Sequence, residues 1–293
     1  MRITNRLGLP DAIVRAVTND EYTRGESDIS VSQLISPPRL TALWALHDDE
    51  IEEDVIDRIW ALLGQAVHTI LERAGDDALT EERLFVDRLG WRISGQFDRV
   101  VLVNRGSDTY EVNDYKLTSA WSVQHGGKDS WTQQLNLYSL LLREHGFRVV
   151  KAGVVAFLRD WRRNDALRYQ DYPQHQVARV PIEVWDDDAQ EHFLADRIKA
   201  HQATRGPDGI LPDCTPEERW QQPAKFAVMK AGRKSALRLF DNSDAAWQYR
   251  GLQPKGKDIT VVKRPGKNTR CEGYCAVSGF CSQWKRIKEE ESA

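Results

Sequence analysis

Two acidic residues and a lysine stand where two neighbouring segments of the chain read as strands. Asp98 follows Gly95 at the end of the first segment, and Asp114 and Lys116 lie two apart in the second. Because side chains alternate between faces along a strand, Asp114 and Lys116 share one face and Glu111 lies on the other. Two carboxylates that approach each other repel unless a cation lies between them. Mg²⁺ or Mn²⁺ prefers such oxygen ligands, and a lysine can stabilise charge on a reacting phosphate. The set suits metal-dependent cleavage of a phosphodiester.

Other candidate residues flank this set. The backbone carbonyl of Tyr115 can fill a further metal position, and His68 falls within a predicted helix. Gln134 and Tyr138 lie four apart and therefore share a helix face, from which an amide and a phenol can hold a phosphate or a base. Taken singly, each of these is more often an ordinary polar residue of an amphipathic helix, and short triplets such as D-Y-K recur by chance. Their combination is more informative than any one of them.

The elements that must position these residues alternate between strands and helices. Apolar residues recur at helical spacing from Ile51 to Leu71 and again from Ser130 to His145. Between the two helices, three segments have the alternation and turn residues of an antiparallel meander. We therefore predict an α/β fold of the α+β kind, a mixed central sheet flanked by helices, with strands at 83–89, 91–103, 109–116, 149–158 and 177–184.

A turn-forming Gly206-Pro207-Asp208-Gly209 sequence predicts a domain boundary. We expect a core at residues 1–205 and a second region at 206–293, with a small basic α/β insertion (hairpin, helix and strand) at about 225–264. Residues 220–288 hold 15 Lys/Arg and 4 Asp/Glu, a balance of +11, whereas the remainder holds 26 and 40, a balance of −14. A basic region on an acidic body indicates contact with a polyanion, although a solvated charged surface gives the same composition.

In their order and short gaps, the motifs resemble those of the PD-(D/E)xK nuclease superfamily. More narrowly, they resemble its RecB-type branch, which includes CRISPR-adaptation exonucleases and related phage nucleases. The branch reads G-x-x-x-H, G-x-x-D, D-x-K and Q-x-x-x-Y, here Gly64/His68, Gly95/Asp98, Asp114/Lys116 and Gln134/Tyr138. The match covers about residues 30–160, and Ser30 to Leu34 resembles the opening helix of the branch. The resemblance implies a restriction-endonuclease-like core in which His68, Asp98 and Asp114 bind a metal and Lys116 is catalytic.

Four cysteines cluster in the last third of the chain, at Cys214, Cys271, Cys275 and Cys281. In an intracellular chain such a cluster is more often a metal site than a pair of disulfides, and four thiolates suit a [4Fe-4S] cluster or a structural zinc. The resemblance favours iron–sulfur. The C-x3-C-x5-C spacing departs from the commoner C-x2-C-x5-C, and an early cysteine usual in cluster-bearing relatives is replaced by Pro37-Pro38. Free or disulfide-bonded cysteines are the alternative.

These observations predict a metal-dependent deoxyribonuclease, an exonuclease rather than an endonuclease, that acts on DNA ends or single strands. The expected settings are recombination, repair, and phage or CRISPR DNA processing, with a partner protein from recombination or CRISPR adaptation. The alternative is a catalytically silent nucleic-acid-binding module of the same fold. No apolar run reaches membrane-spanning length, and Met1 to Thr4 opens no apolar signal segment, so a cytoplasmic location is expected. The oligomeric state is open.

Overall fold

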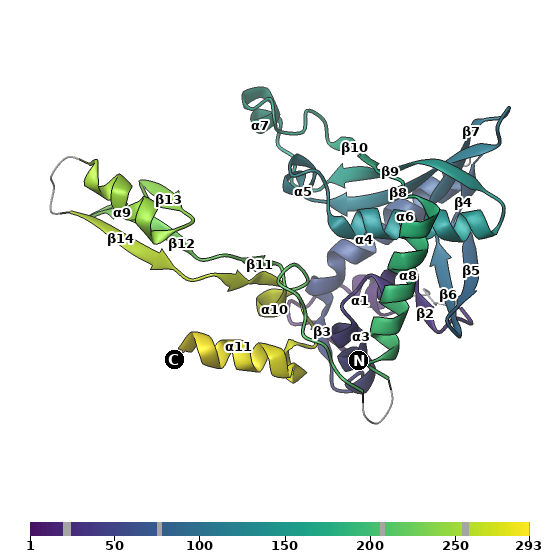
Figure 1. Cartoon of the computed structure of the whole chain (residues 1–293), viewed down its shortest axis with the longest axis horizontal. Coiled ribbons are helices and arrows are strands. Elements are labelled where there is room, and N and C mark those ends of the chain that lie inside the picture. Colours follow the sequence, from purple (N-terminus) through teal and green to yellow (C-terminus); the bar gives the residue numbers. More distant parts are fainter. Residues whose placement is uncertain (20–24, 75–77, 206–208, 254–257, 293) are drawn as a thin grey trace. The chain divides into compact units, whose positions relative to one another are not determined.

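The computed structural model describes residues 1–19, 25–74, 78–205, 209–253 and 258–292 (Figure 1). The chain divides into two compact units, one of Met1–Ala42 with Asp48–Leu211 and one of Leu43–His47 with Pro212–Ala293. In the turn proposed as a domain boundary, residues 206–208 lie outside the described residues. Among the helices in the described ranges, none is long and apolar enough to cross a membrane.

A five-stranded mixed sheet forms the centre of the first unit, in the order β10-β9-β8-β7-β4. β8 runs parallel to β9, and the other neighbours are antiparallel. The apolar β9 has a neighbour on each side, as its sequence predicted. The strands are β4 (Leu79–Thr80), β7 (Arg99–Asn104), β8 (Thr109–Thr118), β9 (Arg148–Leu158) and β10 (Val177–Ile182).

The predicted meander was wrong in one respect, because the segment 91–103 forms two strands in different sheets. β6 (Trp91–Gln96) pairs with β5 (Arg83–Arg88) and β2 (Ile29–Ser30), whereas β7 pairs with β8 and β4. The break falls at Phe97 and Asp98, where the Phe97 side chain is buried in the core. Leu89 and Gly90 join β5 to β6 with φ angles of 51° and 77°, the left-handed geometry of a tight hairpin. The chain thus turns a corner at the residue expected to bind metal.

Two long helices carry the other candidate residues. α4 (Val55–Ala74) corresponds to the first predicted helix, and α6 (Asp129–Glu144) to the second. α6 packs against β9, β8 and β5, and it buries an almost continuous run from Leu135 to Leu142 in the main hydrophobic core. A helix that is apolar on most of its circumference belongs inside a domain, so α6 is a fixed support for the residues along it.

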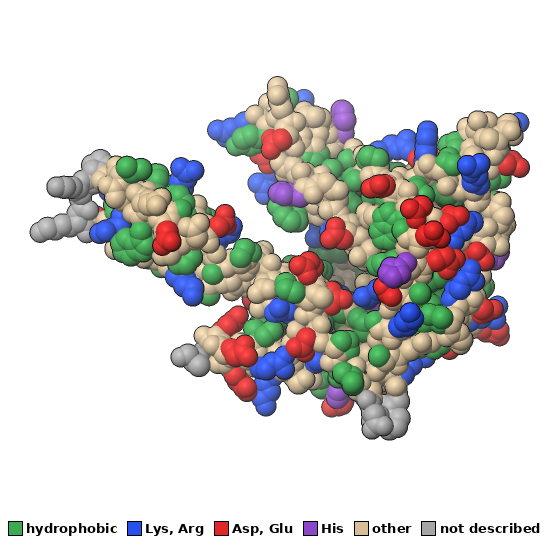
Figure 2. Space-filling model, in the orientation of Figure 1, with side chains coloured by type: hydrophobic (Ala, Val, Ile, Leu, Met, Phe, Trp, Pro, Cys, Tyr) green, Lys and Arg blue, Asp and Glu red, His purple; other side chains and the backbone are tan. Residues whose placement is uncertain are grey.

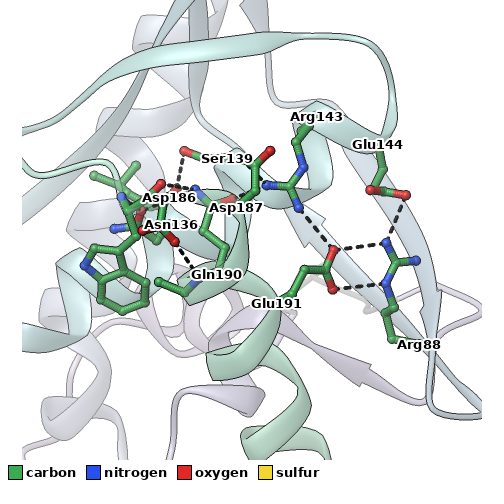
Figure 3. A network of polar contacts seen from close by, with 12 residues as sticks. Arg88, Asn136, Ser139, Arg143, Glu144, Asp186, Asp187, Gln190 and Glu191 are labelled. Carbon is green, nitrogen blue, oxygen red and sulfur yellow. Dashed lines mark hydrogen bonds and ion pairs between the residues drawn. The ribbon is translucent and has the colours of Figure 1, made fainter.

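A polar network holds α6 to α8 (Asp187–Gln202), and Figure 3 shows its members from both helices. The buried Asn136 donates to the carbonyl of Glu183 and accepts from the backbone N–H of Trp185, at 2.9 and 2.7 Å. On the exposed side, Arg143 and Arg88 share the carboxylate of Glu191. Buried polar groups need hydrogen-bond partners, so this network adds to apolar packing in fixing the position of α6. The remaining elements of the unit are β1 (Arg2–Thr4), α1 (Asp11–Thr18), α2 (Val31–Leu34), α3 (Pro38–Leu46, which runs on into the second unit), β3 (Glu52–Asp54), α5 (Ala120–Gln124) and α7 (Arg163–Arg168).

The second unit contains the predicted hairpin, helix and strand. β12 (Lys225–Lys230) lies between β13 (Arg238–Phe240) and β14 (Ile259–Arg264), and α9 (Ser243–Gly251) packs against all three. In Figure 2 this lobe presents Lys and Arg side chains beside hydrophobic ones. The unit also holds β11 (Gln221–Gln222), β15 (Lys267–Asn268), α10 (Thr269–Gly273), a 3-10 turn (Ser278–Phe280) and α11 (Ser282–Ser292).

Candidate active site

Strand pairing brings the two predicted aspartates together. Arg99 pairs with Asn113 across β7 and β8, so Asp98 and Asp114 occupy the next position on each strand. The backbone N–H of Tyr115 donates to Asp98 Oδ2 at 2.5 Å, which ties the corner after β6 to β8. Both aspartates are buried. The antiparallel register proposed from the sequence therefore places two carboxylates at the same end of the sheet.

Lys116 lies on the Asp114 side of this site. Its Nζ is 2.7 Å from Asp114 Oδ2 and 2.9 Å from Oδ1. Burial raises the pKa of Asp114 to about 6; the charge of Lys116 opposes this increase and the charge of Asp98 adds to it. For Lys116, burial lowers the pKa, but the charges of Asp114 and Asp98 outweigh burial and the net change is upward. Lys116 therefore stays protonated, and 28% of its side chain is exposed, so a substrate can reach it.

One oxygen of Asp114 has no hydrogen bond. Asp114 is 1% exposed, and its Oδ2 accepts no hydrogen bond from the described residues, although the ammonium of Lys116 is close enough for an ion pair. Buried carboxylate oxygens in folded proteins are normally hydrogen-bonded or bound to a metal. An oxygen of this kind next to a second carboxylate fits a divalent cation.

His68 forms a second set of candidate ligands with Asp98 and Glu81. Its Nδ1 is 3.3 Å from Glu81 Oε1 and 3.4 Å from Asp98 Oδ1. Hydrogen bonds to Asp98 and then to Glu81 raise the pKa of His68 to about 10, against the effect of burial. In the described ranges, these three are the one set of His, Cys, Asp and Glu side chains whose ligand atoms all lie within 4.8 Å of one another. The proton on His68 balances the charge of the two carboxylates, and a divalent cation bound by the three residues would replace that proton.

Glu81 is the member that the sequence motifs do not contain. It follows β4 in a left-handed conformation with φ of 52°. Its backbone N–H donates to the carbonyl of Asp98 at 3.3 Å, and its other carboxylate oxygen accepts from Gln96 Nε2 at 3.0 Å. The only signal in the sequence is the Glu81-Glu82 pair before β5.

Gln134 and Tyr138 meet on α6 as their spacing predicted. Gln134 Nε2 donates to the Tyr138 hydroxyl at 2.9 Å. The Tyr138 ring is buried against Gly95, where an added Cβ would lie 3.0 Å from the ring and 2.9 Å from Leu141. The glycine of G-x-x-D and the tyrosine of Q-x-x-x-Y thus depend on each other for packing, which the motif alone does not reveal.

The four cysteines of the second unit all lie in the described ranges and are partly buried, and no two of them form a disulfide. Burial raises the pKa of Cys275, and burial together with the neighbouring thiols raises that of Cys271. The buried Gln283 accepts from the backbone N–H of Cys214 at 2.8 Å and donates to its carbonyl at 2.9 Å, two residues beyond Cys281. Among the described residues, no three of these sulfur atoms lie within 4.8 Å of one another.

The comparison with family models identifies the superfamily of the chain. The chain matches the family model of the PD-(D/E)XK nuclease superfamily over residues 39–282 and therefore belongs to that superfamily. Its mixed α/β architecture is the restriction-endonuclease-like fold, and membership indicates a metal-dependent nuclease. No curated protein matches. A solved structure titled "Crystal structure of SSO0001" is 18% identical with a TM-score of 0.42, and the alignment covers 64% of this chain and 82% of that chain.

Proposed function

We propose that this chain is a Mg²⁺- or Mn²⁺-dependent deoxyribonuclease that hydrolyses phosphodiester bonds at DNA ends or in single strands. One observation carries the proposal: the buried Asp114 interacts with both Lys116 and Asp98, and among the described residues its Oδ2 has an ion pair with Lys116 but accepts no hydrogen bond. Burying a carboxylate costs free energy even when a lysine is paired with it, and a module that only bound nucleic acid would gain nothing from that cost.

The residues divide the work as follows. Asp98, Asp114, His68 and the carbonyl of Tyr115 would hold the ion, and Glu81 adds a carboxylate beside His68. A bound Mg²⁺ or Mn²⁺ supplies polarisation of the phosphate and a lowered pKa for water. Lys116 stays protonated, so it donates hydrogen bonds to phosphate oxygens and stabilises the charge that develops there. Gln134 and Tyr138 contact the substrate.

The decisive experiment is digestion of end-labelled linear DNA, single- and double-stranded, with Mg²⁺ or Mn²⁺. Asp114→Asn and Lys116→Met should each lower kcat by at least about 100-fold, because each removes charge stabilisation from the transition state. Circular dichroism and thermal melting serve as folding controls. If both variants cut at the wild-type rate, these roles are wrong.

Preference for an exonuclease rests on the resemblance to the RecB-type branch. A covalently closed circle tests it, because an exonuclease leaves the circle intact while it degrades the linear form. Cutting of both forms at equal rates would indicate a sequence-nonspecific endonuclease. Tight binding without cleavage of any form by the wild type would favour the silent DNA-binding module. The cytoplasmic location and a recombination or CRISPR-adaptation partner remain predictions.

We also propose that Cys214, Cys271, Cys275 and Cys281 hold a [4Fe-4S] cluster, with structural Zn²⁺ as the alternative. The support is chemical: three thiols lie within eleven residues, and Gln283 fastens the backbone of the fourth near Cys281. Either group would fasten the segments of the second unit to one another. Iron and zinc counts with visible absorption of anaerobically purified protein separate the two, and the absence of both metals would reject the proposal.

A further inference from the structure

Arg159 stands at the same end of the sheet as Lys116. β8 and β9 are parallel, with Lys116 paired to Ala156 and Thr118 to Leu158, and the Arg159 N–H donates to the Thr118 carbonyl at 2.9 Å. Arg159 thus lies three residues, about 10 Å, further along the strand direction than Lys116. Carboxyl ends of adjacent parallel strands are where such sheets bind ligands.

Lys128 approaches the same place from the loop between α5 and α6. It is the N-cap residue of α6 and follows Gly126 and Gly127, whose φ angles of 82° and 96° reverse the chain. A Cβ at Gly127 would lie 3.0 Å from the ring of Trp131, so the loop closes tightly onto the helix. The Lys128 side chain itself is exposed.

These two cations have no acidic partner in the part of the chain that the structure describes. Arg159 instead lies over the ring of Trp60 on α4, 4.8 Å from its centroid. The carboxylate of the adjacent Asp160 accepts a hydrogen bond from the Ala120 N–H at 2.7 Å and, in the described ranges, forms no ion pair with Arg159. Burial of part of the Lys128 side chain, followed by the positive charges of Arg159 and Lys116, lowers the pKa of Lys128. Three like charges therefore repel one another beside the active site.

We propose that Lys128 and Arg159 bind phosphates of the substrate strand next to the scissile one, on the Lys116 side of the centre. The proposal rests on the proposed nuclease function and deepens it. Phosphates bound between the three cations would offset their mutual repulsion. An extended DNA strand carries successive phosphates that can contact each cation. The contact with Trp60 holds the Arg159 guanidinium at the sheet end without neutralising it.

Binding measured without metal tests this inference separately from cleavage. The probe is a fluorescein-labelled 20-nucleotide single strand in EDTA, followed by anisotropy at several salt concentrations. Lys128→Ala with Arg159→Ala should weaken binding about tenfold at low salt and reduce the salt slope by about 1.4, because each lost phosphate contact contributes about 0.7 on a single strand. Arg159→Lys should keep most of the slope.

Lys151 provides the matched control. It is an exposed lysine on the same strand as Leu158, eight positions before Arg159 and thus about 26 Å away. Lys151→Ala should leave the salt slope at the wild-type value. In the nuclease assay, the double variant should raise KM several-fold with kcat within about twofold, since it removes binding that is equal in ground and transition states.

The two proposals fail differently. A wild type that cuts DNA while the double variant keeps the wild-type salt slope and KM would refute the phosphate contacts and leave the nuclease function intact. A wild type that never cuts but loses slope in the double variant would refute the nuclease and retain the contacts. A wild type that does not bind the strand in EDTA at low salt would refute the phosphate contacts. Melting temperatures of all variants should stay within a few degrees of the wild type, because both residues are largely exposed and the Arg159–Trp60 contact is a weak one.

Discussion

Replacing Gly95 by alanine tests whether the packing of Tyr138 sets the geometry of α6 against β6. The new Cβ would lie 2.9 Å from Leu141 Cδ2 and 3.0 Å from the Tyr138 ring, whereas ordinary carbon contacts are 3.5–4.0 Å. Both neighbours are buried in the main core, so neither can move into solvent. The backbone at Gly95 is otherwise suitable for any residue, which leaves the close approach as the reason for glycine.

Overpacking of this kind costs about 1–3 kcal/mol of unfolding free energy. Gly95→Ala should therefore lower the melting temperature by several degrees, measured by circular dichroism at constant protein concentration. Adding Leu141→Ala removes one of the two clashing side chains. In a double-mutant cycle the pair should cost less than the sum of the single changes, by at least about 0.5 kcal/mol.

Gly64, the other motif glycine, is the control. It lies inside α4, and an added Cβ would meet nothing within 4 Å. Gly64→Ala should stabilise the protein by about 0.5–1 kcal/mol, because alanine loses less backbone entropy in a helix. If Gly95→Ala is as stable as the wild type, or the cycle shows strict additivity with Leu141→Ala, the packing argument is refuted.

Two further predictions concern titration and metal binding. Burial lowers the pKa of His201 to about 4, while its Nε2 contacts the Leu34 carbonyl at 3.1 Å. The folded state then binds the proton less readily than the unfolded state, so unfolding free energy should fall by up to about 3 kcal/mol as the pH drops from 6.5 towards 4. His201→Gln should flatten that dependence in urea titrations, and an unchanged slope would contradict it. Glu81→Gln should weaken Mn²⁺ binding at least about tenfold in calorimetry without DNA; unchanged affinity would remove Glu81 from the ligand set.

Strand alternation was enough to predict which acid faces the site. The two-residue period placed Asp114 with Lys116 and assigned Glu111 to the opposite face. In the structure Lys116 pairs with Asp114, and Glu111 instead pairs with Arg179 on β10 at 2.5 Å. Local geometry of this sort follows from covalent structure, so a single sequence suffices.

The corner at Asp98 required more than local pattern. Residues 91–103 are apolar enough to be interpreted as one strand, and their alternation does not indicate that the strand breaks at Phe97. The break exists because Phe97 is buried in the core while Asp98 accepts a hydrogen bond from the Tyr115 backbone. Those are tertiary interactions, and a periodicity argument cannot include them.

Glu81 shows why the motifs did not contain every candidate ligand. His68 is thirteen positions before it and Asp98 seventeen after, so no short motif can join the three. Glutamate rarely adopts the left-handed backbone conformation, so its residue type did not predict the turn at this position. What places its carboxylate is the pairing of β4 with β7, through Thr80 and Arg99, which sets the turn after β4 beside the corner after β6. The same break in the chain after β6 therefore brings Glu81 close enough to Asp98 to be a candidate ligand: had 91–103 continued as one strand, Asp98 would point along a sheet face instead of towards that turn.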